Sequence, residues 1–281
     1  MPSGLRLPDF IAVGPPRTGT TWLYRVLSGH VGFPEGIKET HFFSRYYDRG
    51  IDRYRWYFRN CAQGVPMGEV DPLNFDSERA RERIALHIPN CEIIVTLREP
   101  VERAYSHYKT LLKTGEVRHQ PFNFGKHRRA VGMSKTYAQH LRGWFEKFGR
   151  ERVLVMLYDD LKSDPQSYIN RICEFIGIAP IDLSNSPLRD SPVNPNLDQP
   201  RSYLVAHAVM KLRRKFKKYQ WIGLAQKLES GTPLSSFFLK GGPMFPPLNR
   251  DEAARAKATV RAEVEELELL IGRDLSAWKK P

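Results

Sequence analysis

The chain has 281 residues, of which 41% are hydrophobic and 27% charged, and its formal net charge is +13. This composition is typical of a globular protein and excludes a disordered or collagen-like chain. No apolar run approaches the roughly 18 residues that span a bilayer, and the segment from Met1 to Phe10 has no apolar stretch long enough for a signal peptide, which predicts a cytoplasmic protein. The positive charge predicts affinity for anions and leaves nucleic acid, anionic lipid, nucleotides and sulfated or phosphorylated substrates open.

The cysteines give no sign of a disulfide framework or a zinc site. Cys61, Cys91 and Cys173 are widely spaced, odd in number and without the paired spacing of metal ligands. We therefore predict free thiols, and the sequence shows no ligand cluster that would require a metal.

Three short apolar runs predict buried strands, at Phe10 to Gly14, Glu92 to Leu97 and Val153 to Leu157. Helical spacing predicts helices at Trp22 to Leu27, Val101 to Thr114, Ser134 to Phe148 and Ser163 to Ile176. Continuous apolar strands that alternate with helices are typical of a parallel sheet covered on both faces. We predict an α/β fold with a P-loop-like, doubly wound parallel sheet and helices on both faces, in a single domain over residues 1–281.

The C-terminal third contains a proline-rich connection and two predicted helices. Five prolines between Ile178 and Pro200 predict a long extended segment. Leu204 to Leu228 has an apolar stripe surrounded by lysines and arginines, which predicts a basic amphipathic helix, and a last helix begins near Asp251 and ends at Gly272. The basic helix fits a solvated face, or a wall that attracts an anionic acceptor or a membrane surface. Nucleic-acid binding is disfavoured because no recognition motif accompanies the charge.

The segment from Gly14 to Thr21 follows a predicted strand and opens a predicted helix. It has the two glycines of the phosphate loop G-x-x-x-x-G-K-S/T, but Thr20 stands in the lysine position. Backbone amides at such a helix N-terminus favour an anion, and Arg17 offers a cation from within the loop. The missing lysine argues against an ordinary ATP or GTP hydrolase. A glycine- and threonine-rich turn without a ligand is the alternative.

One motif comprises Arg17, Thr18, Gly19, Thr20, Thr21 and Trp22, and a second comprises residues 98–106, Arg-Glu-Pro-Val-Glu-Arg-Ala-Tyr-Ser. Both resemble motifs of sulfotransferases that use 3′-phosphoadenosine-5′-phosphosulfate (PAPS). In that family a loop of the form K/R-x-G-T-S/T, which the first motif matches, holds the 5′-phosphosulfate. A second motif, R-D/E-P-x-x-R-x-x-S, binds the 3′-phosphate and matches residues 98–106, which implies Arg98 and Ser106 as ligands. Arg98 lies at the end of a predicted strand and Ser106 in the predicted helix that follows, which also allows both side chains to donate hydrogen bonds to one phosphate. An ordinary surface ion pair between Arg98 and Glu102 is the alternative.

A third segment, residues 38–43, reads Lys-Glu-Thr-His-Phe-Phe. It resembles the segment E-x-H-F-F of the heparan sulfate N- and 3-O-sulfotransferases and their bacterial relatives, which implies Glu39 as the base that deprotonates the acceptor. His41 is the rival base. Relatives often carry E-K-T-P at residues 69–72, where this chain has Val70 in the lysine position. The run Lys240, Gly241, Gly242 resembles the K-G loop that closes over the 3′-phosphate and adenine, with a surface turn as the alternative.

The resemblance implies metal-independent, in-line transfer of a sulfuryl group from PAPS, leaving 3′-phosphoadenosine-5′-phosphate (PAP). The expected acceptor is a hydroxyl, with an amine as second choice, on a carbohydrate, lipid or secondary metabolite. Glu39 would take the acceptor proton, and Arg17 with the loop amides would stabilise the leaving phosphate oxygen. The rival functions are an ATP-dependent nucleotide or small-molecule kinase with a variant phosphate loop, and a basic nucleic-acid- or membrane-binding protein with a vestigial pocket.

Overall fold

The computed structural model describes residues 5–117, 121–189, 199–218, 241–245 and 247–280. The chain divides into two compact units. The first comprises Met1–Glu99, Lys135–Val193 and Ala262–Ala277, and the second comprises Pro100–Ser134, Asn194–Arg261 and Trp278–Pro281. Among the described residues, none of the helices combines the length and the apolar character needed to cross a membrane.

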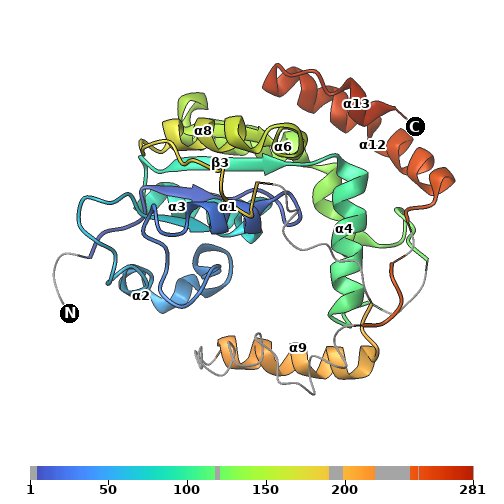
Figure 1. Ribbon diagram of the computed structural model, residues 1–281, viewed down its shortest axis with the longest axis horizontal. Coiled ribbons are helices and arrows are strands. Elements are labelled where there is room, and N and C mark those ends of the chain that lie inside the picture. The colour runs from blue at the N-terminus through green and yellow to red at the C-terminus, as the bar shows by residue number, and fades with distance from the viewer. Residues whose placement is uncertain (1–4, 118–120, 190–198, 219–240, 246, 281) are drawn as a thin grey trace. The chain divides into compact units, whose positions relative to one another are not determined.

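The first unit is built on a four-stranded parallel sheet (Figure 1). Its strands lie in the order β2-β1-β3-β4 and have the bounds β1 Phe10–Ala12, β2 Gly68–Val70, β3 Glu92–Leu97 and β4 Val153–Leu157. The predicted α/β class with a parallel sheet is confirmed. The sequence patterns indicated β1, β3 and β4 but not β2, which is only three residues long and has a glutamate at its centre.

The helices of the first unit alternate with the strands. They are α1 Thr20–Leu27, η1 Phe42–Tyr46, η2 Tyr47–Arg49, α2 Ile51–Trp56, η3 Pro72–Asn74, α3 Glu78–His87, α6 Tyr137–Phe148, η5 Arg150–Arg152, α7 Tyr158–Ser163 and α8 Pro165–Phe175. The predicted helix from Ser163 begins later because Asp164 caps the amide of Ser167 and Pro165 occupies the first helical turn. The predicted helix from Ser134 is divided into η4 Gly132–Lys135 and α6.

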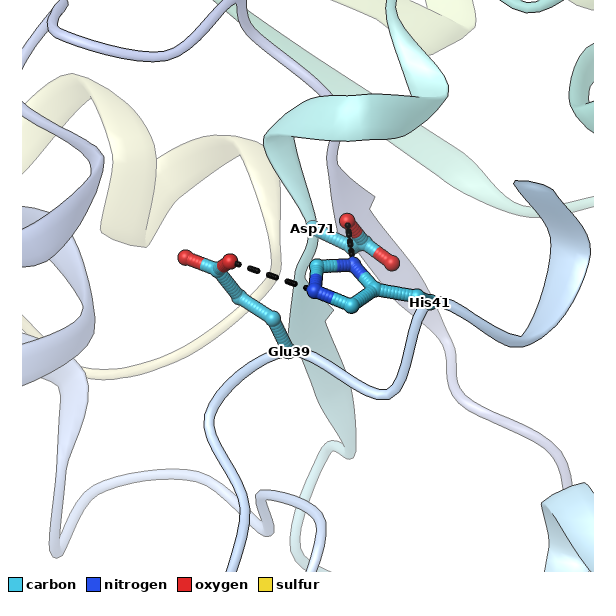
Figure 2. A group of neighbouring side chains, drawn as sticks. All are labelled: Glu39, His41 and Asp71. Carbon is cyan, nitrogen blue, oxygen red and sulfur yellow. Dashed lines mark hydrogen bonds and ion pairs between the residues drawn. The ribbon is translucent and has the colours of Figure 1, made fainter. Parts of the chain in front are cut away.

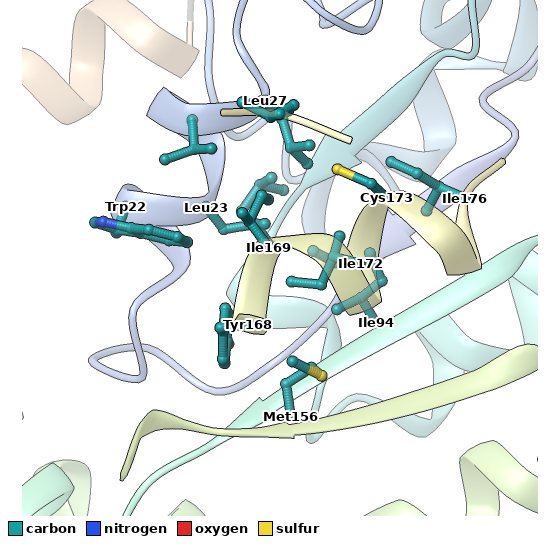
Figure 3. Close-up of a cluster of buried hydrophobic side chains, with 14 of the residues drawn as sticks. Trp22, Leu23, Leu27, Ile94, Met156, Tyr168, Ile169, Ile172, Cys173 and Ile176 are labelled. Carbon is teal, nitrogen blue, oxygen red and sulfur yellow. The ribbon is translucent and has the colours of Figure 1, made fainter. Parts of the chain in front are cut away.

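Both faces of the sheet are buried. On one face α1 and α8 pack over the strands, where Leu23 and Ile169 join Ile94 and Met156 in a single apolar cluster (Figure 3). Successive strand residues point to opposite faces, and the alternate residue Ile93 is also fully buried. Burial of both faces is the arrangement expected for a parallel sheet, and it leaves the carboxyl ends of the strands as the edge where loops gather.

The described residues of the second unit are mainly helical. They form α4 Pro100–Lys113, α5 Arg128–Val131 and α9 Tyr203–Lys218, and α12 Arg250–Ile271 and α13 Ser276–Lys279 contribute to both units. A core around Tyr108, Leu112 and Ala130 joins α4 to α5. The predicted basic helix is described as far as Lys218, and its predicted continuation over residues 219–228 lies outside the described residues. The three cysteines are free, as predicted.

Candidate active site

The phosphate loop follows β1 and is held against β3. The Thr18 hydroxyl is fully buried, donates to the Pro15 carbonyl at 2.7 Å and lies 2.6 Å from the Thr96 hydroxyl. Gly14 is required by this packing, because a Cβ there would lie 2.2 Å from Thr96 Oγ1. The loop is therefore anchored by Thr18, whose side chain is used inside the protein and leaves only its backbone for a ligand.

The loop opens α1 in a conformation suited to an anion. Arg17 has φ 78° and Gly19 has φ 95°, both in the left-handed region. For a residue with a Cβ this region is strained, by about 1–3 kcal/mol, and it is commonly found at functional sites. Helix α1 begins at Thr20, with no acidic residue in its first turn and no side-chain cap. Its N-terminal amides and the helix dipole thus favour a bound anion.

Two arginines gather beside this loop. Burial and then the positive charge of Arg98 lower the pKa of Arg17 to about 10. The Arg98 guanidinium, just after β3, lies over the Tyr158 ring at 4.6 Å, and Tyr158 begins α7 directly after β4. Tyr158 in turn faces Gly19, where a Cβ would lie 3.3 Å from its Cδ2. Two neighbouring positive charges at the ends of adjacent strands form a site that favours a multiply charged anion.

Trp22 has a packing role in this structure. Its side chain is 4% exposed, and its indole N–H donates to the Leu188 carbonyl at 2.8 Å. The ring also meets Tyr168 of α8 edge to face. Of the predicted loop residues, Trp22 is thus placed in the hydrophobic core, where it fixes α1 to α8.

The predicted acid–base segment lies next to the phosphate loop. Lys38 Nζ donates to Thr21 Oγ1 at 3.2 Å and to Glu39 Oε1 at 2.9 Å. Thr21 is in the first turn of α1, so Lys38 connects the helix that opens the phosphate loop to the predicted base. This contact spans 17 residues of sequence, and Lys38 was not among the predicted site residues. Its position directly before Glu39 was the available signal.

His41 lies between two carboxylates (Figure 2). Its Nδ1 is 3.0 Å from Asp71 Oδ1, and its Nε2 is 3.7 Å from Glu39 Oε2. Because a carboxylate accepts hydrogen bonds, the Nδ1 contact assigns the proton to Nδ1 and directs Nε2 toward Glu39. Burial opposes protonation, but the charge and hydrogen bond of Asp71 and the charge of Glu39 outweigh it and raise the pKa of His41.

Changing Asp71 to asparagine is expected to lower the pKa of His41. The substitution removes the buried negative charge at 3.0 Å but keeps a hydrogen-bonding side chain of the same shape. The raised pKa stabilises the folded state below about pH 6.5 and this contribution is lost as the pH rises through the folded value, so the variant should also lose stability at low pH. An NMR titration of the His41 ring in both proteins measures the shift. An unchanged His41 titration curve would contradict the assignment.

A second buried carboxylate, Glu69, holds the loop that carries Glu39 and His41. It lies at the centre of β2, is fully buried, and accepts hydrogen bonds from the Thr40 amide at 2.8 Å and the Tyr54 hydroxyl at 2.7 Å. Burial and the nearby charge of Asp71 raise the pKa of Glu69 to about 7. Glu69 and Asp71, on the same short strand and its end, thus fix the segment from two sides.

The buried Glu69 is expected to make the stability of the fold depend on pH. Because its pKa rises from 4.5 to about 7 on folding, protonated Glu69 favours the fold below about pH 4.5, and this contribution, on the order of 3 kcal/mol, is lost as the pH rises to about 7. Glu69→Gln, which cannot ionise, should remove that decline. Urea unfolding between pH 4.5 and 7.5 measures it, with the exposed Glu146→Gln as control. If the unfolding free energy falls equally with pH in wild type and Glu69→Gln, the group that loses its proton over this range is not Glu69.

Glu39, His41 and Asp71 also bring three potential metal-ligating groups together. One ligand atom each from Glu39, His41 and Asp71 lies within 4.8 Å of the others. However, the two carboxylates contact different nitrogens of the His41 ring, and Lys38 already occupies one oxygen of Glu39. Lys38 and Asp71 thus hydrogen-bond to Glu39 and His41 from opposite ends, and Glu39 and His41 form an ion pair between them. This geometry does not favour a shared ion.

The other predicted ligands belong to the second unit or lie outside the described residues. Ser106 is on α4 and is 8% exposed. Gly242 donates its amide to the Gln199 carbonyl, and a Cβ on it would lie 2.6 Å from that oxygen, so backbone packing requires glycine there. Gly241 has φ 73° and accepts a hydrogen bond from Arg201. Lys240 lies outside the described residues. The roles of these residues toward a 3′-phosphate stay predictions.

Comparison with known proteins identifies relatives of the chain. The sulfotransferase domain family model matches residues 7–202. Heparan sulfate glucosamine 3-O-sulfotransferase 6 of Mus musculus is 33% identical over 187 residues, covering 63% of this chain and 54% of that protein. The bifunctional heparan sulfate N-deacetylase/N-sulfotransferase of Drosophila melanogaster is 29% identical over 215 residues, covering 64% of this chain and 20% of that protein. The chain thus spans about half the length of the first relative and a fifth of the second.

Solved structures agree on the fold. A sulfotransferase from Alicyclobacillus acidocaldarius superposes with a TM-score of 0.66 at 22% identity, covering 98% of this chain and all of that one. The sulfotransferase domain of the Synechococcus PCC 7002 olefin synthase gives a TM-score of 0.50 at 17% identity, covering 90% and 94% of the two chains. At these identities the likeness concerns the fold alone.

Proposed function

Because the chain belongs to the sulfotransferase family, we propose that it transfers a sulfuryl group from PAPS to a hydroxyl group of a carbohydrate acceptor. The observation that carries this proposal is the link from the phosphate loop to an acid–base group, from Thr21 through Lys38 to Glu39. A phosphate-binding loop alone fits many nucleotide-binding proteins. A carboxylate held beside it adds the means to deprotonate an acceptor at the same place.

The donor is supported by the charges at the strand ends. The 5′-phosphosulfate would lie on the loop amides between Arg17 and Thr21, and Arg98 would bind the 3′-phosphate, with Ser106 as its proposed second ligand. The residues present suit such an anion because Arg17 and Arg98 bring two positive charges together, with the N-terminus of α1 beside them. Thr20 in the lysine position disfavours the kinase alternative, since that lysine neutralises the phosphates of ATP.

The reaction would proceed by direct displacement at sulfur. The acceptor oxygen attacks, its proton passes to Glu39, and the bond between sulfur and the leaving phosphate oxygen breaks. Arg17 and the loop amides then stabilise the charge on that oxygen. His41, with Nε2 3.7 Å from Glu39 and Nδ1 held by Asp71, is the second group able to take the proton.

The carbohydrate class is supported by the relatives, which are named for heparan sulfate and its glucosamine. A hydroxyl is the first choice and an amine the second, because relatives of both the 3-O and the N type match this chain at similar identity. Lipids and secondary metabolites stay open as acceptors.

A transfer assay tests the proposal. Donor labelled with ³⁵S in its sulfuryl group is incubated with the protein and, separately, with N-acetylated and N-unsubstituted glucosamine oligosaccharides, a glycolipid and a phenol. Label on an N-acetylated oligosaccharide supports hydroxyl transfer to a carbohydrate. Label only on the unsubstituted oligosaccharide indicates the amine. Label from γ-³²P-ATP with magnesium, and none from PAPS, would contradict the proposal.

A further inference from the structure

Two positions that carry lysine in the patterns compared above lack one in this chain. Position 20 is lysine in the general phosphate loop G-x-x-x-x-G-K-S/T but threonine here, as in the sulfotransferase loop K/R-x-G-T-S/T, and Val70 stands where relatives often carry the lysine of E-K-T-P. The Val70 side chain is fully buried in the apolar cluster with Phe10 and Ala12. Neither position therefore supplies an ammonium group to the phosphate loop.

Lys38 brings an ammonium group to this place from another segment. Its Nζ is 3.2 Å from Thr21 Oγ1 in the first turn of α1, and 2.9 Å from Glu39 Oε1. The ion pair between the adjacent residues Lys38 and Glu39 is weak evidence for a role by itself. The contact with Thr21 is stronger evidence, because it holds a lysine from the acid–base segment against the phosphate loop. The side chain is 22% exposed, so a ligand can reach it.

The proposed reaction removes negative charge from one neighbour of Lys38 and places it on another. Before transfer, the Glu39 carboxylate is negative and Lys38 is bonded to it. As the acceptor oxygen bonds to sulfur, its proton neutralises Glu39, while the electron pair of the broken sulfur–oxygen bond goes to the phosphate. Negative charge thus disappears from one partner of Lys38 and develops on the ligand of the loop that Lys38 also contacts. An interaction that strengthens in this way lowers the barrier, because it is stronger in the transition state than before it.

We infer that Lys38 is a further catalytic residue, which donates from Nζ to the 5′-phosphate oxygen that leaves sulfur and adds an ammonium group to the positive charge that Arg17 provides. The inference rests on the proposed function, since it assigns a role within the same site. It places Lys38 between the leaving group and the base, and it gives the Thr21 hydroxyl the task of holding the ammonium in place before the donor binds.

Nucleotide binding tests this role without knowledge of the acceptor. PAP carries the 5′-phosphate, and adenosine 3′-phosphate lacks it, so only PAP can contact Lys38 at that group. Calorimetric titration of both ligands is compared between wild type and Lys38→Met, which keeps the length of the side chain and removes its charge. The exposed Lys147→Met is the matched control. We expect Lys38→Met to lose about tenfold or more in affinity for PAP and to retain wild-type affinity for adenosine 3′-phosphate.

Three outcomes overturn the inference, and they are distinguishable. Equal losses for both nucleotides would indicate a structural role for Lys38. Unchanged PAP affinity would show that Lys38 does not reach the 5′-phosphate. A wild-type protein that binds neither nucleotide would overturn the proposed function itself. Lys38→Arg provides the rescue: it should recover most of the preference for PAP, because guanidinium keeps both the charge and the donors.

Discussion

Replacing Glu39 with glutamine is expected to reduce sulfuryl transfer by about 10²- to 10⁴-fold, the usual contribution of a positioned general base. The amide has the shape of the carboxylate and can still accept a hydrogen bond from Lys38, but it cannot take a proton. Affinity for PAP should stay near that of wild type, because the bonds that anchor the phosphate loop lie in Thr18 and Thr96. The initial rate with labelled donor and the PAP affinity are measured on the same preparations.

The control for this result is Glu146→Gln, an exposed glutamate on α6. The competing assignment is His41, whose Nε2 faces Glu39. If Glu39→Gln keeps the wild-type rate and His41→Gln abolishes transfer, His41 is the base and the Glu39 assignment is wrong. If both variants lose activity, the pH profiles separate the roles: loss of the base removes its ionisation step from the pH–rate profile, whereas loss of a positioning group lowers the rate and leaves that step in place.

Replacing Arg98 with alanine is expected to weaken PAP binding by about 10- to 100-fold, the loss for a charge-assisted hydrogen-bonding partner of a phosphate. Affinity for adenosine 5′-phosphate, which lacks the 3′-phosphate, should change much less. Arg98 follows β3 directly and is held over the Tyr158 ring, so its guanidinium is oriented before any ligand binds. Calorimetric titration of both nucleotides measures the change in preference.

The matched control is Arg79→Ala, which removes an exposed arginine from α3. A comparable loss of affinity for both nucleotides in Arg98→Ala would place Arg98 at the 5′-phosphate instead. An unchanged affinity for PAP would remove Arg98 from the site. Thermal unfolding of the variant without ligand accounts for the lost contact with Tyr158, which is worth about 0.5–1 kcal/mol at an exposed site.

The sequence predicted the parts of the fold that have strong local patterns. The strands β1, β3 and β4 are apolar runs, and the phosphate loop carries its own spacing of glycines, so each is recognisable without its neighbours. Strand β2 was missed because three residues with a central glutamate have no usable periodicity. Glu69 is buried there only because Thr40 and Tyr54, from two other segments, satisfy its oxygens.

The sequence motifs name the candidate site residues, but they do not show the contacts that hold those residues in place. The motifs indicated Arg17, Arg98, Glu39 and His41, whereas the contacts that orient them are long-range. Lys38 reaches Thr21 across 17 residues and Asp71 reaches His41 across 30, and no local spacing encodes such pairs. These contacts depend on the order of the strands, which brings the end of β2 beside β1.

Sulfotransferase activity requires a site for a 3′-phosphorylated nucleotide, and the thermal stability of the protein with PAP, ADP and AMP, each with and without magnesium, tests for it. At about 100 times its dissociation constant, a ligand that binds only the folded state adds roughly 2.7 kcal/mol to stability, enough to raise the melting temperature by several degrees. We expect PAP to raise the melting temperature without magnesium, ADP and AMP to raise it far less, and Arg98→Ala to remove the preference for PAP. Equal or greater stabilisation by ADP with magnesium would show that the site is not built for PAPS.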